Sequence, residues 1–310
     1  MDIVITGAAG HIGSELIRTL PKYFPNAHFI LIDSFMSQRY PSIFQLDRNI
    51  KYTIYQEDLK TFDLTKIISK DAKVINLAAI TDAAGSFSNA TIVEENNFLV
   101  TETVATACAK IGASLIALSS TSVYGTQSDK VSEDCLPEDL NPQSPYAETK
   151  LKEENLLRHL KDIANLDYTC CRFGTIYGPS IGMRFHTAVN KFCWQASLGL
   201  PITVWRTAYN QKRPYLYLGD AVKAISFILQ EEIFHGETFN VLTENLTVKD
   251  VTDSIKTFYP DLTIEFVDTE IMNQLSYEVS NKKFCDLGFR FHGNISKGIN
   301  ETFKYLYRKN

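Results

Sequence analysis

Two residues near the middle of the chain have the types and the spacing needed for proton transfer. Tyr146 and Lys150 are four positions apart in the stretch SPYAETK, which has the pattern of a helix start, so we expect both side chains on one helix face. A free phenol has a pKa of about 10 and is a poor base at neutral pH. Because a neighbouring ammonium favours the phenolate, Tyr146 can remove the proton of an alcohol while a hydride leaves the same carbon.

A run of hydroxyl side chains offers further groups for such a reaction. The stretch LSSTSVYG, residues 118–125, places three serines and one threonine at the end of an apolar run, with no acid or base among them. The run has the pattern of a buried strand, and polar residues at its end either complete a turn or face a cleft. Hydroxyl groups can hydrogen-bond a substrate oxygen, but they cannot replace a carboxylate in proton transfer.

A glycine-rich loop near the start of the chain predicts the hydride acceptor. In IVITGAAGHIG, Gly7, Gly10 and Gly13 come directly after a strand pattern and open an amphipathic helix. This context is typical of a loop whose backbone amides and helix N-terminus hold a dinucleotide pyrophosphate. His11 and Ile12 lie within the same loop, so we expect them at the cofactor too.

Acidic residues after the next strands bear on the choice of dinucleotide. Asp33 follows Gly13 by twenty residues, where a carboxylate accepts hydrogen bonds from the adenosine ribose and repels a 2′-phosphate. We therefore expect NAD rather than NADP, although Arg39 close by works against this preference. Asp58, followed by Leu59, either binds the adenine amino group or caps a helix or turn.

The elements that must position these residues alternate between strand and helix patterns. The expected strands are 3–6, 29–32, 51–56, 73–78, 114–119 and 167–173, and the expected helices between them are 11–20, 61–70, 91–111 and 146–162. Near-continuous apolar strands alternating with helices predict an α/β fold with a Rossmann-type, doubly wound parallel sheet.

The pattern changes after Tyr177, where a smaller C-terminal α/β lobe is expected. It includes a helix at about 184–198, a helix beginning after Thr247, and a short helix closed by Gly288. We expect residues 1–175 with about 211–242 to form the NAD-binding domain. Residues of about 176–210 together with 243–310 are expected to form the substrate-binding lobe.

Composition narrows the class of protein. The 310 residues carry a net charge of −5 without a basic cluster, which argues against nucleic acid as a partner. The six cysteines form no CxxC pair and lie near no histidine at ligand spacing, so we expect reduced thiols and no metal site. The chain begins with a strand pattern and has no apolar stretch of the ~18 residues that a membrane span needs, so a cytoplasmic protein is expected.

Taken together, these residues resemble the short-chain dehydrogenase/reductase superfamily. More narrowly, they resemble its extended branch of NAD-dependent epimerases and dehydratases, which act on nucleotide-activated sugars. The similarity spans about residues 1–242. The residues that carry it are Gly7, Gly10, Gly13, Asp33, Asp58, Leu59, Leu77, Ala78, Ala79, Asn96, Ser119, Ser120, the VYG of 123–125, Tyr146, Lys150, the stretch RFGTIYGP (172–179) and RPYLYLGDAV (213–222) with its structural Asp220.

This resemblance implies roles for several of these residues. Ser120, three positions before the valine of VYG, is expected to hydrogen-bond the reacting sugar oxygen, with Thr121 as the neighbouring candidate. Ser119 is expected on the nicotinamide side. Arg213 is expected to contact the nucleotide diphosphate, although a solvated charge at a strand end is the alternative.

Backbone atoms near the end of a further strand, at Leu77, Ala78 and Ala79, are expected beside the cofactor. The resemblance also implies that Asn96 supports the helix and the cofactor region.

The chain departs from the family pattern on the substrate side. Thr175 stands where many members have an asparagine, and Gly174 beside it leaves room for a bulkier group. Arg184 and His186 are expected to face the substrate lobe. His186 is either a second acid or base or, more commonly for a single histidine, a packed or solvated residue.

The absence of an acidic residue at positions 121 and 122 bears on which of the family's reactions this chain can perform. Dehydratases of this branch carry Asp-Glu where this chain has Thr121 and Ser122, and decarboxylases carry Glu at the position of Ser122. We therefore expect a 4-epimerase that makes a transient 4-keto sugar and retains NAD, with a nucleotide-sugar reductase, dehydrogenase or dehydratase as the alternative. Epimerisation at another carbon stays open if His186 or Asp82 transfers protons.

Two further classes of protein are alternatives to a nucleotide-sugar enzyme. A dehydrogenase of a non-nucleotide alcohol has no use for the diphosphate contact expected of Arg213. A non-enzymatic NAD sensor has no use for the pair formed by Tyr146 and Lys150, which this chain retains.

The helices at 91–111 and 146–162 carry apolar positions that bear on assembly, namely Val93, Val100, Val104, Leu151 and Leu157. In the family, two such helices pair with their copies in a dimer, so a homodimer is expected. Burial of the same stripe within one chain is the alternative.

Overall fold

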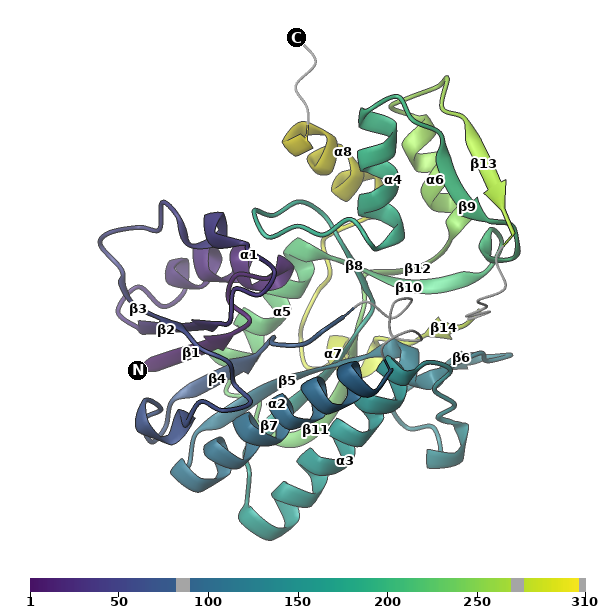
Figure 1. Cartoon of the computed structure of the whole chain (residues 1–310). Coiled ribbons are helices and arrows are strands. Elements are labelled where there is room, and N and C mark those ends of the chain that lie inside the picture. Colours follow the sequence, from purple (N-terminus) through teal and green to yellow (C-terminus); the bar gives the residue numbers. More distant parts are fainter. Residues whose placement is uncertain (82–89, 269–275, 307–310) are drawn as a thin grey trace.

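The central sheet of the molecule has seven parallel strands in the order β11-β7-β5-β4-β1-β2-β3 (Figure 1). The computed structural model describes residues 1–81, 90–268 and 276–306. The strands are β1 (Asp2–Thr6), β2 (His28–Asp33), β3 (Lys51–Gln56), β4 (Lys73–Asn76), β5 (Ser114–Ser120), β7 (Tyr168–Phe173) and β11 (His235–Val241). This arrangement confirms the predicted Rossmann-type, doubly wound fold.

Helices cover both faces of this sheet, because the strands are apolar on both sides. In β1, Ile3 and Ile5 pack into one core, whereas Val4 between them packs into the other. The first face carries α1 (His11–Thr19) and α5 (Leu218–Gln230). The second carries α2 (Ala90–Ile111) and α3 (Pro145–Ala164), which lie side by side in Figure 1.

Local sequence signals set the bounds of α3. The hydroxyl of Ser144 accepts a hydrogen bond from the Ala147 amide, and Pro145 occupies the first turn, where its missing N–H costs nothing. The helix ends at Asn165, which adopts the left-handed conformation with φ 51°. Tyr146 and Lys150 are therefore held in the first two turns of a well-defined helix.

The helix expected at 61–70 is wrong. The structure has only a 3₁₀ turn there, at Leu64–Lys66. The Asp63 carboxylate accepts hydrogen bonds from the amide and the hydroxyl of Thr65, and such local bonds compete with a continuing helix. Leu64 and Ile68 are still buried in the second core. The spacing of these apolar residues therefore reflects their packing against the sheet and not a continuous helix.

Smaller sheets and three helices surround a third core at the other end of the molecule (Figure 1). One sheet has the order β12 (Glu244–Thr247), β10 (Lys212–Tyr217), β8 (Thr175–Tyr177), and another pairs β9 (Ile202–Trp205) with β13 (Ile264–Val267). A separate short pair, β6 (Lys130–Val131) with β14 (Glu278–Val279), packs into a fourth core cluster with Val123 and Tyr124. The helices are α4 (Ala188–Ser197), α6 (Val248–Lys256) and α8 (Ile295–Leu306). As expected, Thr247 caps α6, with its hydroxyl accepting from the Asp250 amide at 3.0 Å.

One short helix lies apart from that third core. In α7 (Lys282–Asp286), Phe284 packs into the core of the large sheet, although the sequence-based partition assigned 243–310 to the smaller lobe. The partition into two lobes itself stays a prediction. Asp220 has the expected structural role, since its carboxylate accepts from the Thr243 hydroxyl and the amides of His292 and Gly293.

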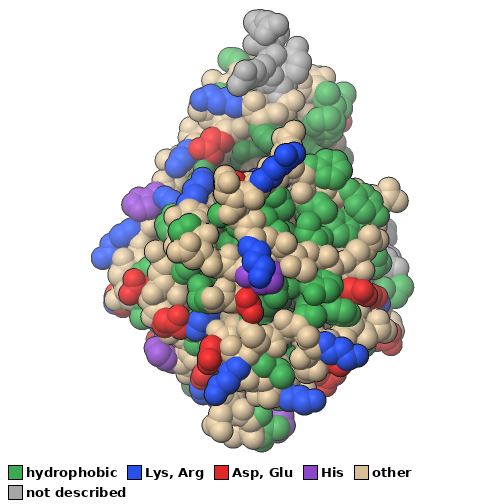
Figure 2. Space-filling view, turned by 90° about the vertical axis from the view of Figure 1, so that its left-hand side faces the viewer, with side chains coloured by type: hydrophobic (Ala, Val, Ile, Leu, Met, Phe, Trp, Pro, Cys, Tyr) green, Lys and Arg blue, Asp and Glu red, His purple; other side chains and the backbone are tan. Residues whose placement is uncertain are grey.

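Acidic and basic side chains are interspersed on the face of the molecule shown in Figure 2. Among the described residues, no helix is both long enough and apolar enough to cross a membrane.

Candidate active site

A cavity of about 420 Å³ lies at the carboxyl ends of β1, β4 and β5, where an open parallel sheet binds its ligands. Its wall continues through the start of α3, β8, the segment before α4, and β9. It brings together most of the residues chosen from the sequence: Gly7, Gly10, His11, Ile12, Gly13, Leu77, Ala78, Ala79, Ser119, Ser120, Thr121, Tyr146, Lys150, Thr175, Arg184, His186 and Arg213.

The glycine loop approaches neighbouring backbone too closely for any side chain. A Cβ on Gly7, whose φ is +62°, would lie 2.8 Å from the Ala78 nitrogen. A Cβ on Gly13 would lie 2.5 Å from the Gly7 carbonyl oxygen. The N-terminus of α1 therefore reaches the cavity wall with bare backbone, which fits a dinucleotide pyrophosphate.

Asp33 lies at the end of β2 beside this loop. One carboxylate oxygen accepts from the Ala9 amide at 2.9 Å and the other from the Phe35 amide at 2.8 Å. The charge therefore stands next to the loop, as an adenosine ribose contact requires. Asp33 itself is outside the lining of the cavity described above.

Asp58 and Leu59 lie outside that lining too. One oxygen of the Asp58 carboxylate accepts from the Lys60 amide at 3.0 Å, and the other is 3.5 Å from the Lys60 ammonium. Leu59 is buried in the second core. The structure therefore shows Asp58 as a turn cap, and a contact with adenine stays a prediction.

Tyr146 and Lys150 meet at the cavity wall. The Lys150 ammonium is 5.8 Å from the centre of the Tyr146 ring, and Lys150 is only 4% exposed. Burial raises the pKa of Tyr146 above its ordinary value, while the charge on Lys150 acts to lower it. The phenol thus depends on nearby positive charge to ionise at neutral pH.

The hydroxyl groups of Ser119 and Ser120 have different hydrogen-bond partners. Ser119 donates to the Glu154 carboxylate at 2.5 Å and is buried. Ser120 accepts from the Ser122 amide at 3.2 Å and from the Ser122 hydroxyl at 2.9 Å, which leaves its own proton to donate. Ser120 is therefore the hydroxyl suited to a substrate oxygen, whereas that of Ser119 is committed to the core.

The remaining member of the run is held away from such a contact. The Thr121 hydroxyl donates to the Phe173 carbonyl at 3.3 Å and is 3.4 Å from the Tyr277 hydroxyl. Its expected contact with substrate stays a prediction.

The substrate side of the cavity collects cationic and polar groups. Thr175 on β8 and Arg213 on β10 belong to neighbouring strands, while Arg184 and His186 come from the segment before α4. The Arg184 guanidinium donates to the hydroxyl of Thr81. These positions fit an anionic substrate, and their individual contacts with it stay predictions.

Asn97, the residue after Asn96 on α2, holds the segment that follows β4. The Asn97 side chain accepts from the Ile80 amide at 2.8 Å and donates to the Ile80 carbonyl at 2.9 Å. Asn96 donates to the Asn97 side chain and is outside the cavity lining, so the role expected of Asn96 stays a prediction. Two successive asparagines on a helix look alike in sequence, and only Asn97, at 1% exposure, turns inward.

Other lining residues were missed. Lys191 on α4 and Trp205 at the end of β9 lie in the wall, and neither belongs to a motif considered from the sequence. The available signal for Lys191 was a lysine within the largely apolar stretch AVNKFCW. Asp82, considered as a proton-transfer group, lies outside the described residues.

The sheet order, the bare glycine loop and the Tyr–Lys pair define the class of protein, a dinucleotide-dependent enzyme of the short-chain dehydrogenase type. Residues 3–241 match the model described as the NAD dependent epimerase/dehydratase family. The chain belongs to this family. The predicted family, NAD as cofactor and the enzyme class are thereby confirmed.

Known proteins are similar over much of the chain. The uncharacterized UDP-glucose epimerase YtcB of Bacillus subtilis (strain 168) is 32% identical over 254 residues, 78% of this chain and 76% of the relative. A trifunctional UDP-glucose 4,6-dehydratase/UDP-4-keto-6-deoxy-D-glucose 3,5-epimerase/UDP-4-keto-L-rhamnose-reductase of Arabidopsis thaliana is 28% identical over 319 residues. That match covers 98% of this chain but 47% of the plant protein, so the chain spans about half of its length.

A solved structure matches over nearly the whole fold. It is a tyrosine-to-phenylalanine mutant of the UDP-glucuronic acid 4-epimerase from Bacillus cereus, in complex with UDP-4-deoxy-4-fluoro-glucuronic acid and NAD. It is 27% identical, aligns over 98% of both chains and has a TM-score of 0.87.

Proposed function

We propose that this chain is a UDP-sugar 4-epimerase that retains NAD through the catalytic cycle. The observation that carries the proposal is the gathering of Ser120, Tyr146 and Lys150 at one wall, with hydroxyls at Thr121 and Ser122. These groups serve hydride transfer and reversible deprotonation of one alcohol. Elimination and decarboxylation need a further acid or base, which hydroxyl side chains do not supply.

The residues present assign the proton steps. Ser120 donates a hydrogen bond to the 4-oxygen of the sugar, and the phenolate of Tyr146 takes the proton of that hydroxyl. Lys150 stabilises the phenolate through its charge. NAD, when bound, supplies the acceptor and later the donor of the hydride. After the ketone has turned, Tyr146 returns the proton to the 4-oxygen, and the sugar leaves with inverted configuration at C4.

Features of the far wall support a nucleotide diphosphate over a lipid alcohol. Lys191 and Arg213 bring two cations to the substrate side, and Trp205 brings an aromatic face. A guanidinium fork and an ammonium suit a diphosphate, and an aromatic ring suits a base. The names of the 27% identical epimerase and of its UDP-sugar ligand support the same class.

The decisive experiment offers the purified protein UDP-glucose, UDP-glucuronic acid and UDP-N-acetylglucosamine with NAD, and follows the sugars by NMR. Inversion at C4 without net NADH is the expected result. Accumulation of NADH would assign a dehydrogenase, and a 4-keto-6-deoxy product would assign a dehydratase, a reaction named in the plant relative. Failure to turn over or bind any of the three would overturn the proposal.

The homodimer and the cytoplasmic location remain proposals. Of the five positions that suggested a dimer stripe, Val93, Val100, Val104 and Leu157 are buried within one chain, and Leu151 is half-buried against the core cluster of Val123 and Tyr124. They therefore give no support to an interface, and light scattering of the purified protein would decide the assembly.

A further inference from the structure

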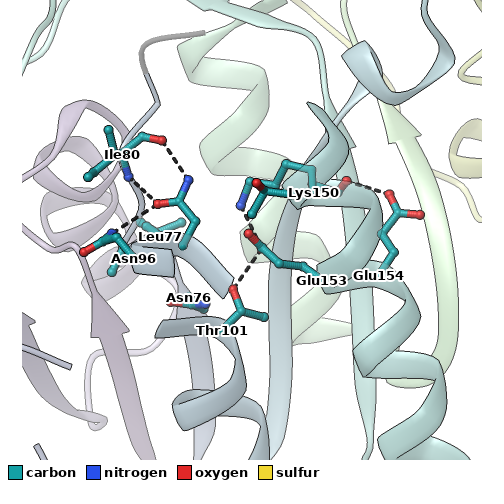
Figure 3. Close-up of polar contacts among 12 residues, drawn as sticks. Asn76, Leu77, Ile80, Asn96, Thr101, Lys150, Glu153 and Glu154 are labelled. Atoms are coloured by element: carbon teal, nitrogen blue, oxygen red, sulfur yellow. Dashed lines mark hydrogen bonds and ion pairs between the residues drawn. The ribbon is translucent and has the colours of Figure 1, made fainter. Parts of the chain in front are cut away.

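A buried carboxylate contacts the amine that assists the proposed base. Glu153, one turn after Lys150 on α3, places Oε2 at 2.9 Å from the Lys150 Nζ. Both residues are 4% exposed. The same oxygen accepts from the Thr101 hydroxyl of α2 at 2.8 Å (Figure 3). The carboxylate is thus clamped between two helices, with the lysine as its only charged hydrogen-bond partner among the described residues.

The use of its two oxygens distinguishes Glu153 from its neighbour. Both oxygens of the Glu154 carboxylate accept hydrogen bonds. Oε1 accepts from the Ser119 hydroxyl and from Nε of Arg172, and Oε2 accepts from a second nitrogen of Arg172. The Oε1 of Glu153 is buried and has no hydrogen-bond partner within the described parts of the chain. A purely structural buried carboxylate is normally saturated, because each unpaired oxygen costs stability.

We propose that Glu153 is a positioning residue for the reaction, which holds Lys150 at the cavity wall in its charged form so that Lys150 can assist Tyr146. The idea rests on the proposed function only in taking Tyr146 as the base. Glu153 would then act together with Tyr146 and Lys150, through its contact with the Lys150 ammonium.

The physical need for such a residue follows from the burial of Lys150. Burial acts to lower the pKa of an amine, and here the charge of Glu153, with smaller contributions from Tyr146 and Cys170, raises the pKa of Lys150 above its ordinary value. Without Glu153, the described residues offer Lys150 no carboxylate within hydrogen-bond distance. The amine would then lose its proton at a lower pH.

Glu153 also has a direct and opposing effect on the base. Its negative charge raises the pKa of Tyr146, but the lowering effect of Lys150 is larger, and Arg184 acts in the same direction as Lys150. Glu154 acts on Glu153 as a second negative charge, and it is itself paired with Arg172. The net benefit of Glu153 therefore comes through the lysine.

The variant Glu153→Gln tests this role with two readouts. First, the rate at which an amine-reactive reagent modifies Lys150, followed by peptide mass spectrometry as pH rises, should increase at a lower pH than in the wild type. This readout needs no substrate. Second, the kcat of Glu153→Gln should be closest to that of the wild type near neutral pH. At alkaline pH it should be about tenfold or more below the wild-type kcat, because Lys150 of the variant loses its charge there.

Matched variants separate this role from a loss of folding. Glu153→Asp keeps the carboxylate and should restore the wild-type pH profile in part. Glu148→Gln removes one charge from an exposed position on the same helix and should change nothing. If the reactivity profile of Lys150 in folded Glu153→Gln equals that of the wild type, the inference is wrong. If that profile shifts but no UDP-sugar is turned over, the inference stands and the proposed function fails.

Discussion

Ser119 Oγ donates a hydrogen bond to Glu154 Oε1 at 2.5 Å, although the two residues are 35 positions apart. This bond ties the end of β5 to α3, the two elements that supply Ser120 and Tyr146. Because successive strand residues point to opposite faces, fixing Ser119 inward turns Ser120 toward the cavity. The geometry of the proposed active site thus depends on a contact in the core.

The ion pair behind this contact should carry much of the local stability. Glu154→Gln leaves the guanidinium of Arg172 buried without a counter-charge, so we expect a loss of about 3 kcal/mol or more in the free energy of unfolding, measured in urea. Asp253→Asn breaks the exposed pair with Lys249 and should cost less than about 1 kcal/mol. Equal effects of the two variants would contradict the prediction.

Tyr146→Phe should abolish turnover while leaving the cofactor in place. The change removes only the phenolic oxygen, so kcat is expected to fall about a hundredfold or more, with unchanged NAD content by mass spectrometry of the denatured protein. Tyr305→Phe, at a side chain that is 52% exposed, is the control. Full activity of Tyr146→Phe would falsify the assignment of the base.

Asp33→Asn should weaken the preference for NAD. The variant loses the negative charge and one of the two acceptor oxygens that now bind the amides of Ala9 and Phe35. We expect NAD affinity to fall about tenfold and NADP binding to improve relative to it, both measured by calorimetry. Asp47→Asn, at an exposed position, should change neither affinity. An unaltered ratio would show that Asp33 does not set the cofactor preference.

Acid should weaken the molecule through His11. Burial lowers the pKa of His11 from 6.5 to about 4, and its Nε2 donates to the Gly178 carbonyl at 2.9 Å. Below about pH 6.5 the unfolded chain takes up a proton that the folded chain does not, so stability falls as pH falls toward about 4.

His11→Gln removes this titration while keeping a donor for Gly178. Between pH 7.5 and pH 5 the wild type should lose about 2 kcal/mol more than the variant in urea unfolding. His159→Gln, at an exposed site on α3, should behave as the wild type does. Parallel stability curves for the wild type and His11→Gln would show that His11 is not the group responsible.

Local signals in the sequence determined the architecture and the position of the chemistry. Alternating apolar runs predict a doubly wound sheet, and the glycines after the first strand predict the phosphate loop with its helix. The spacing of Tyr146 and Lys150 predicts a shared helix face. These features can be read from the chain because they depend on residues near one another, through turn geometry, capping and helical periodicity.

Tertiary packing decided which neighbouring residues take each role. One residue along a helix rotates a side chain by about 100°, so Asn97 rather than Asn96 holds Ile80. One residue along a strand reverses its face, so Ser119 binds the core and Ser120 the cavity. The sequence contains these candidates side by side.

Packing also decided what the apolar and acidic residues of α2 and α3 do. The valines that suggested a dimer are buried within the chain, and the Glu153 carboxylate, one helical turn from Lys150, also accepts from Thr101 of α2, 52 positions away. Such outcomes are set by contacts between segments that lie far apart in sequence. The sequence pattern therefore predicts the fold and the Tyr–Lys motif, whereas tertiary contacts determine which side chains interact with one another.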